Sequence, residues 1–193
     1  MNTNFSMEFI KAFNELMKSE VGPNFDPTDS ATINGLIDTS QNRKKCGYVN
    51  IKTDNGGETK FGIAQKFNPN INVSTMTLEQ AMQCCFDTYW ILNHCDKLAH
   101  PLNVIHLDGA YNHGSSQETK FLQRAAKIDS VDGILGPNTM KIICSLDPMV
   151  LSLNILDQRT EFFTKISAKP GQAIFLKGWL NRIDGLRSFL KTA

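Results

Sequence analysis

The sequence has few cysteines and histidines and almost no net charge, and each shortage excludes a class of protein. Five cysteines and four histidines are spread over 193 residues without a CxxC pair or an HExxH motif, so the ligand spacings typical of zinc sites are missing. An odd cysteine count favours free thiols over a disulfide framework. A formal net charge of +1 argues against a broad nucleic-acid footprint, which needs a strongly basic face. We therefore expect no nucleic-acid partner, no metal and no other cofactor.

Long hydrophobic runs are missing as well. The longest apolar stretches are well short of the ~20 residues that span a membrane, so we expect no stable membrane insertion. The N-terminal MNTNFSMEFIKAF has no basic region before an apolar core, and no signal peptide is visible. With 41% hydrophobic residues, the chain can form a core as one domain or as a domain with a small subdomain.

A carboxylate at the end of an apolar helical stripe is the strongest functional signal. Residues 6–19 predict a helix with Ser6 as its N-cap, and Gly22-Pro23 ends it. Continuing the apolar face places Glu20 on it, where burial would disfavour the charged form and raise its pKa. The stripe is formed by Phe9, Ile10, Phe13, Leu16 and Met17, which follow the spacing of one helical face.

Two segments of different character follow this helix. Residues 22–46 are rich in Asp, Asn, Ser, Thr, Pro and Gly and predict a long surface loop with a short helical turn over 32–38; loops of this length are often functional. Residues 47–64, GYVNIKTDNGGETKFGIA, predict a β-hairpin with a glycine turn and a second strand over 59–63.

The remainder of the chain predicts helices. Thr77-x-x-Gln80 and Ser115-x-x-Glu118 have the pattern of capping boxes, the first opening a helix to about residue 93 with Leu92 facing inward. Pro137 and Pro148 suit the first positions of two further helices. The resulting fold class is mostly α: an α+β arrangement with a helical bundle and one small β-hairpin near the N-terminal third.

Glu20 and the hairpin together offer the groups that glycoside hydrolysis needs. That reaction requires a carboxylic acid still protonated near neutral pH, which donates its proton to the departing oxygen. Across from Glu20, the hairpin supplies Asp54 as a base or electrostatic partner and Thr59 as a hydroxyl that can hold water. Glu58 is a further carboxylate beside the turn.

The hairpin segment closely resembles the Glu-Gly-Gly-Tyr…Asp-x-Gly-Gly-x-Thr-x-x-Gly-Ile signature of the phage-type N-acetylmuramidases of glycoside hydrolase family 108. Further segments resemble that family in the same order. They are Tyr89-Trp90, HLDGAYNHG (106–114), FLQRA (121–125), VDGILGPNT (131–139) and FLKGWLNRI (175–183).

The resemblance implies a lysozyme-like catalytic lobe over residues 1–115 and a helical C-terminal lobe over 116–193, packed as one globular unit. The second lobe resembles a peptidoglycan-binding subdomain. The implied function is a peptidoglycan hydrolase that cleaves the β-1,4 bond between N-acetylmuramic acid and N-acetylglucosamine during phage-mediated lysis. Catalysis would fall to Glu20, Asp54 and Thr59, and substrate binding to Tyr48, Asn50, Glu58, Tyr111 and Asn112.

One departure from the family concerns the active site itself. In the family the catalytic Glu directly precedes Gly-Gly-Tyr, whereas here residues 22–46 separate Glu20 from Gly47-Tyr48. The insertion must loop out if Glu20 is to meet the hairpin. The insertion keeps one alternative open, a non-catalytic peptidoglycan-binding or structural virion protein. A lytic transglycosylase on the same scaffold, which needs a single Glu and no water, is a second alternative.

The predicted function implies where the protein acts and what it contacts. We expect a monomer, synthesised in a host cytoplasm, that acts on peptidoglycan glycan strands in the periplasm or cell wall; association with a virion is an alternative. Residues 159–193 carry seven basic and two acidic side chains. This basic end either contacts an anionic envelope or forms a solvated helix face. The loop at 131–139 is either architectural or a ligand contact, and His113 is expected at the surface.

Overall fold

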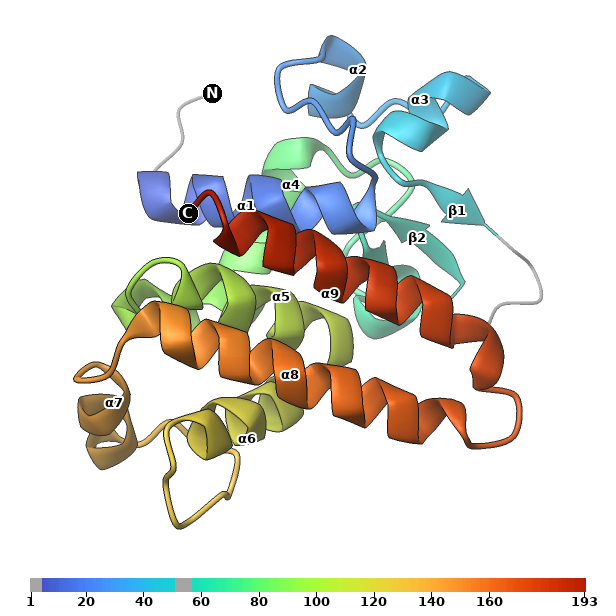
Figure 1. Ribbon diagram of the computed structural model, residues 1–193. Coiled ribbons are helices and arrows are strands. Elements are labelled where there is room, and N and C mark those ends of the chain that lie inside the picture. The colour runs from blue at the N-terminus through green and yellow to red at the C-terminus, as the bar shows by residue number, and fades with distance from the viewer. Residues whose placement is uncertain (1–4, 51–56) are drawn as a thin grey trace. The chain divides into compact units, whose positions relative to one another are not determined.

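Figure 1 shows the computed structural model of the chain, which describes residues 5–50 and 57–193. Within these residues the chain is mostly helical with one small antiparallel sheet, as predicted. It divides into two compact units, Met1–Thr88 and Tyr89–Ala193, here called the N-terminal unit and the C-terminal unit.

The first helix of the N-terminal unit, α1 (Met7–Glu20), confirms the sequence prediction. The Ser6 hydroxyl oxygen accepts a hydrogen bond from the Phe9 amide at 3.2 Å and caps the helix, which satisfies one of the free amides of the first turn. The predicted apolar stripe is largely buried, since Phe9, Ala12, Phe13, Leu16 and Met17 form the buried face.

Residues 22–46 form two short helices instead of a loop with a single turn. Helix α2 (Ser30–Ile33) begins after Asp29, whose carboxylate accepts from the Thr32 amide at 3.0 Å. Helix α3 (Ser40–Lys45) begins after Thr39, whose hydroxyl accepts from the Asn42 amide at 3.1 Å. The helical turn expected over 32–38 overlaps α2 but begins earlier, at Ser30, and ends at Ile33, and α3 is an additional helix. Asp29 and Thr39 cap the two helix starts.

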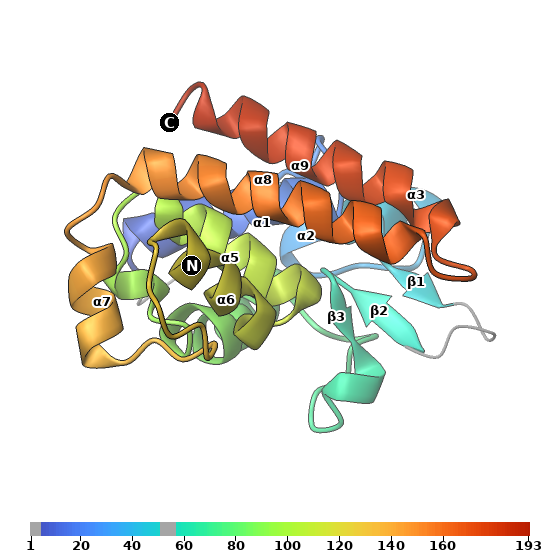
Figure 2. The ribbon, with the colours of Figure 1, turned by 60° about the horizontal axis from the view of Figure 1, so that its bottom comes forward.

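The sheet has three short antiparallel strands in the order β1-β2-β3: β1 (Val49–Asn50), β2 (Glu58–Lys60) and β3 (Ile63–Ala64) (Figure 2). The single second strand predicted over 59–63 is wrong. Phe61 and Gly62 have positive φ values of 52° and 78°, and this tight turn reverses the chain into β3.

The N-terminal unit ends with η1 (Gln65–Phe67) and helix α4 (Leu78–Cys85). The Thr77–Gln80 capping box that opens α4 is confirmed. The helix continues into a π-helical turn, η2 (Phe86–Ile91). Because a π-helix has more residues per turn than an α-helix, the face presented changes, and Leu92 is 70% exposed rather than inward-facing.

The C-terminal unit is a helical bundle around a central helix, α5 (Leu102–His113), whose residues 102–110 are all buried. A helix buried on every side lies in the middle of a core. Helices α6 (Ser115–Ala125) and α8 (Pro148–Ser167) pack on α5, and α9 (Leu176–Leu190) lies along α8. The remaining elements are η3 (Cys95–Lys97), α7 (Pro137–Ile143) and η4 (Ala173–Phe175).

Both proline helix starts are confirmed, since Pro137 and Pro148 occupy the first turns of α7 and α8. Among residues 5–50 and 57–193, no single helix is long and apolar enough to cross a membrane. Within these residues, only α7 and α8 taken together have the length and apolar composition of a membrane span, and the two helices are bent by 107° relative to each other.

Candidate active site

Glu20 is the last residue of α1 and is partly buried. The insertion leaves the helix directly after it and returns at Gly47, which has a φ of +59°. A Cβ atom on Gly47 would lie 3.2 Å from the carbonyl oxygen of Glu20 and 3.3 Å from Cγ2 of Val21. Residues 22–46 therefore loop out and bring the chain back to the end of α1, so that the segment leading into β1 adjoins Glu20.

Three of the predicted substrate-binding residues lie together on one face of the sheet. Asn50 pairs directly with Glu58 across β1 and β2. The Tyr48 hydroxyl donates to the Glu58 carboxylate, and Nδ2 of Asn50 donates to the Tyr48 oxygen at 3.4 Å. The hydrogen bond to Glu58 raises the pKa of Tyr48, because it stabilises the protonated phenol. The phenol thus remains a neutral hydrogen-bonding group beside a carboxylate.

Thr59 stands on the other face of the sheet. It pairs with Val49 on one side and Ala64 on the other, and successive side chains of a strand point to opposite faces. Its hydroxyl is therefore directed away from the face that carries Glu58. Asp54 lies outside the described residues.

Lys60 anchors the sheet from within, and nothing in the sequence pattern singled it out. Its side chain is fully buried, and its Nζ donates to the Ser74 carbonyl oxygen at 2.9 Å. Burial lowers the pKa of Lys60, since desolvation disfavours the ammonium form. Lysine side chains are mostly exposed to solvent, so the sequence alone predicts an exposed Lys60. Only the tertiary packing shows that this side chain is buried.

The two remaining predicted binding residues belong to the C-terminal unit. Tyr111 lies in the last turn of α5, where its ring packs against Tyr89 with 4.7 Å between the ring centroids. Asn112 follows it and is exposed. The polar groups of both residues lie at the end of α5, and their role in substrate binding stays a prediction.

The capping box predicted at Ser115-x-x-Glu118 is wrong. Gly114 precedes α6 as its N-cap position, and no side-chain capping bond forms there. Glu118 is instead fully buried, with its carboxylate 2.7 Å from the NH2 group of Arg159. Phe121 and Leu122, three and four residues later, are also buried. Helical spacing from these two residues is the signal that could have placed Glu118 on the inner face.

Glu118 and Arg159 belong to a buried ionic network in the C-terminal unit. The Arg159 guanidinium also contacts Asp108 at 3.0 Å, and Arg182 contacts the same carboxylate at 2.8 Å. Two carboxylates thus face two guanidinium groups, which balances the buried charge. His113, expected at the surface, is instead nearly buried, with Nε2 3.0 Å from Glu118.

The pKa of Glu118 shows which effect dominates in this network. Burial opposes ionisation, but the Arg159 charge and the His113 ring, whose Nε2 lies 3.0 Å from the carboxylate, outweigh it and hold the pKa well below its usual range. Charged groups this completely buried occur only when they are paired. The network joins α5, α6, α8 and α9 around one centre.

The same contacts change the interpretation of the basic C-terminal end. Arg159 and Arg182 are engaged inside the unit, and Arg187 pairs with Asp157 at 2.6 Å. Three of the seven basic groups thus have carboxylate partners from earlier in the chain. The positive charge available for an anionic envelope is smaller than the sequence indicates.

The loop at 131–139 is held by side-chain bonds typical of an architectural element. Nε2 of Gln123 donates to Asp132 at 2.7 Å, and its Oε1 accepts from the Gly133 amide at 2.8 Å. The Asp132 carboxylate also accepts from the Ile134 amide at 2.9 Å. These bonds explain the Asp-Gly turn as a structural feature.

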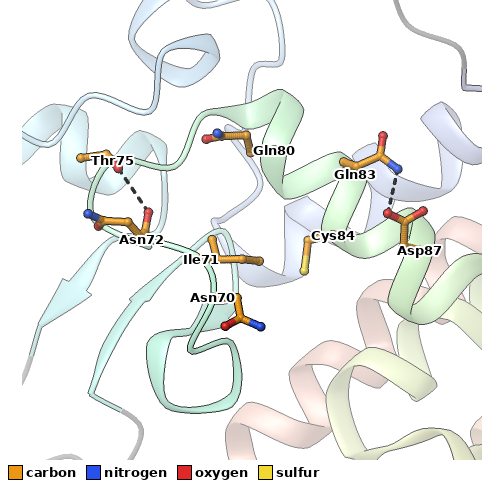
Figure 3. Close-up of a pocket in the computed structure, with 8 residues that line it drawn as sticks. All are labelled: Asn70, Ile71, Asn72, Thr75, Gln80, Gln83, Cys84 and Asp87. Carbon is orange, nitrogen blue, oxygen red and sulfur yellow. Dashed lines mark hydrogen bonds between the residues drawn. The ribbon is translucent and has the colours of Figure 1, made fainter.

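A cavity of about 370 Å³ lies beside α4, and four of its eight lining residues carry amide side chains (Figure 3). Several of these polar groups already have partners: Gln80 belongs to the capping box, and Gln83 donates to Asp87 at 2.8 Å. None of the predicted site residues lines it. The lining residues are Asn70, Ile71, Asn72, Thr75, Gln80, Gln83, Cys84 and Asp87.

No group of three or more His, Cys, Asp and Glu side chains that could hold a metal ion occurs among residues 5–50 and 57–193. All five cysteines are free thiols, as expected, and Cys46, Cys85 and Cys95 are buried.

Comparison with known proteins supports the sequence resemblance. Residues 39–114 match the family model described as glycosyl hydrolase 108, and residues 117–184 match the model described as predicted peptidoglycan domain. The two matches confirm the predicted family and its C-terminal peptidoglycan-binding part. None of the curated proteins matches this chain.

Among solved structures, the chain is similar to one described as the structure of Brucella abortus SagA. The two share 21% sequence identity with a TM-score of 0.70, over 96% of this chain and 94% of the other. A likeness at this identity concerns the fold alone. It confirms the predicted mostly α, lysozyme-like class.

Proposed function

We propose that this chain, with its glycosyl hydrolase 108 match followed by a peptidoglycan domain match, is an N-acetylmuramidase. The two matches support a glycoside hydrolase that acts on peptidoglycan in the cell wall. The finer assignment is hydrolysis of the β-1,4 bond between N-acetylmuramic acid and N-acetylglucosamine. The observation that carries it is the return of the chain at Gly47 to the backbone of Glu20, because it restores the adjacency that the family motif has in sequence.

In this proposal Glu20 is the general acid. It is partly buried at the end of α1, beside the point where the chain returns at Gly47. Proton donation to the departing glycosidic oxygen relieves the charge that develops there. Asp54 assists as the second carboxylate, and Thr59 holds the attacking water through its hydroxyl. Because Thr59 and Glu58 lie on opposite faces of the sheet, the proposal requires the glycan to pass the edge of the sheet and contact both faces. Tyr48, Asn50 and Glu58 form a hydrogen-bonded group that binds sugar hydroxyls or N-acetyl groups, with Tyr111 and Asn112 as further contacts.

The test is the release of reducing ends from purified peptidoglycan by the wild-type protein and by Glu20→Gln. We expect the substitution to abolish release, because the amide cannot donate the required proton. Glu15→Gln on the same helix is the matched control, since the Glu15 carboxylate pairs with Lys18 of the same helix. Equal activity of Glu20→Gln and wild type would disprove the assignment.

The same reaction separates the two alternatives. A lytic transglycosylase would release fragments with a 1,6-anhydro end, which mass spectrometry identifies, whereas a hydrolase leaves a reducing end. A non-catalytic binding or virion protein would sediment with purified sacculi and release neither. The proposed biological setting is phage-mediated lysis of the host, with a free monomer acting on the wall from the periplasmic side.

A further inference from the structure

The insertion forms a cavity of about 390 Å³ within the N-terminal unit. One wall is the chain that leaves α1 at residues 21–25, and the other is formed by Gln41, Lys44 and Lys45 of α3. This volume is in the range of small-ligand sites. Both walls therefore come from the two ends of the insertion, and the first begins one residue after Glu20.

The cavity combines an apolar part with uncompensated positive charge. Val21, Pro23 and Phe25 supply apolar surface. The Lys45 ammonium is paired with Asp29 at 2.7 Å. Lys44 is exposed, and within residues 5–50 and 57–193 its ammonium has no carboxylate within ion-pair distance.

The other charged groups of the insertion are already engaged. Arg43 donates from Nε to the Ile37 carbonyl oxygen at 2.8 Å and lies over the Tyr48 ring. Asp26 accepts from Thr28, and Asp38 accepts from Asn42. The helix dipole favours basic residues in the last turn of α3, which explains why lysines occur there. It does not explain why Lys44 lines a cavity.

We propose that this cavity binds the peptide stem of peptidoglycan. The ammonium of Lys44 pairs with a free carboxylate of the stem, the Gln41 amide bonds to its peptide groups, and Val21, Pro23 and Phe25 take small alkyl side chains. The proposal rests on the proposed function, because the glycan must lie at Glu20 for its stem to reach residues 21–25. The insertion then makes the enzyme prefer strands that carry stems.

The first experiment compares cleavage of intact peptidoglycan with cleavage of the same strands after an amidase has removed the stems. We expect Lys44→Glu to lose about tenfold or more in kcat/KM on intact material, the size of one charge-assisted hydrogen bond, and to match wild type on stripped strands. Lys11→Glu, which makes the same charge change at an exposed position of α1, should behave as wild type on both. An equal loss on both substrates, or none on either, would overturn the proposal.

A second experiment does not depend on catalysis. Calorimetric titration measures the binding of a synthetic stem tetrapeptide, and of the same peptide with amidated carboxyl groups, to wild type and Lys44→Glu. We expect wild type to bind the free acid about tenfold more tightly than either the amidated peptide or the variant does. Equal affinities would reject the stem site. If wild type cleaves neither substrate while this difference persists, the hydrolase assignment fails and the stem site stands.

Discussion

Gly47 lies against the backbone of Glu20, so closely that a Cβ atom at position 47 would be 3.2 Å from the Glu20 carbonyl oxygen. Its φ of +59° is a conformation that residues with a Cβ adopt only at a cost. Position 47 therefore needs glycine for two independent reasons. This contact closes the insertion and determines where the end of α1 sits relative to the strand that follows.

The first prediction concerns Gly47→Ala. We expect it to lower the free energy of unfolding by about 2–3 kcal/mol, since it adds a close contact to the backbone strain. Activity on peptidoglycan should fall as well, because a displacement of a catalytic group by about 1 Å can cost ~100-fold in rate. Urea unfolding and reducing-end release measure the two effects.

Gly171→Ala is the matched control for Gly47→Ala. Gly171 has a similar positive φ of +76°, but nothing lies within 4 Å of a Cβ built there. It should lose only the strain contribution of about 1–2 kcal/mol and retain full activity. Equal destabilisation by the two substitutions would show that the Gly47–Glu20 contact contributes nothing.

The second prediction concerns the buried network. Glu118→Gln should lower the free energy of unfolding by about 3–5 kcal/mol, because it removes one partner of a buried ion pair and leaves part of the Arg159 charge uncompensated. Glu161→Gln on the exposed side of α8 is the control and should change it by less than about 0.5 kcal/mol. A small loss for Glu118→Gln would mean that Asp108 alone balances Arg159.

The third prediction is the pH dependence that follows from Glu118. Its pKa is far below the ordinary value of 4.5 in the folded protein, so the unfolded chain takes up the proton first as the pH falls. The stabilisation is therefore complete above about pH 4.5 and is lost as the pH falls through the folded pKa. Urea unfolding between pH 7 and pH 3 should show a smaller loss of stability for Glu118→Gln than for wild type. Parallel curves would contradict this origin.

Local rules were sufficient for much of the fold. Ser6, Thr77, Pro137 and Pro148 each start a helix where the sequence predicts one, because caps and N-terminal prolines act on backbone groups within three residues of themselves. The ordered motifs likewise predicted the family that the comparisons confirmed. Leu92 does not follow the helical spacing, because the π-helical turn before it changes the direction of its side chain and leaves it exposed.

The sequence by itself determined the helical class, the family motifs and a carboxylate at the end of an apolar stripe, and it excluded metal-site spacings and a strongly basic surface. Tertiary structure alone decided that Gly47 returns to Glu20, that Lys60 is buried, and that Glu118 bonds to Arg159 rather than capping its own helix. Glu118 and Arg159 are 41 residues apart. A pairing over that distance depends on how α6 and α8 pack around α5, whereas a cap depends only on its own turn of helix.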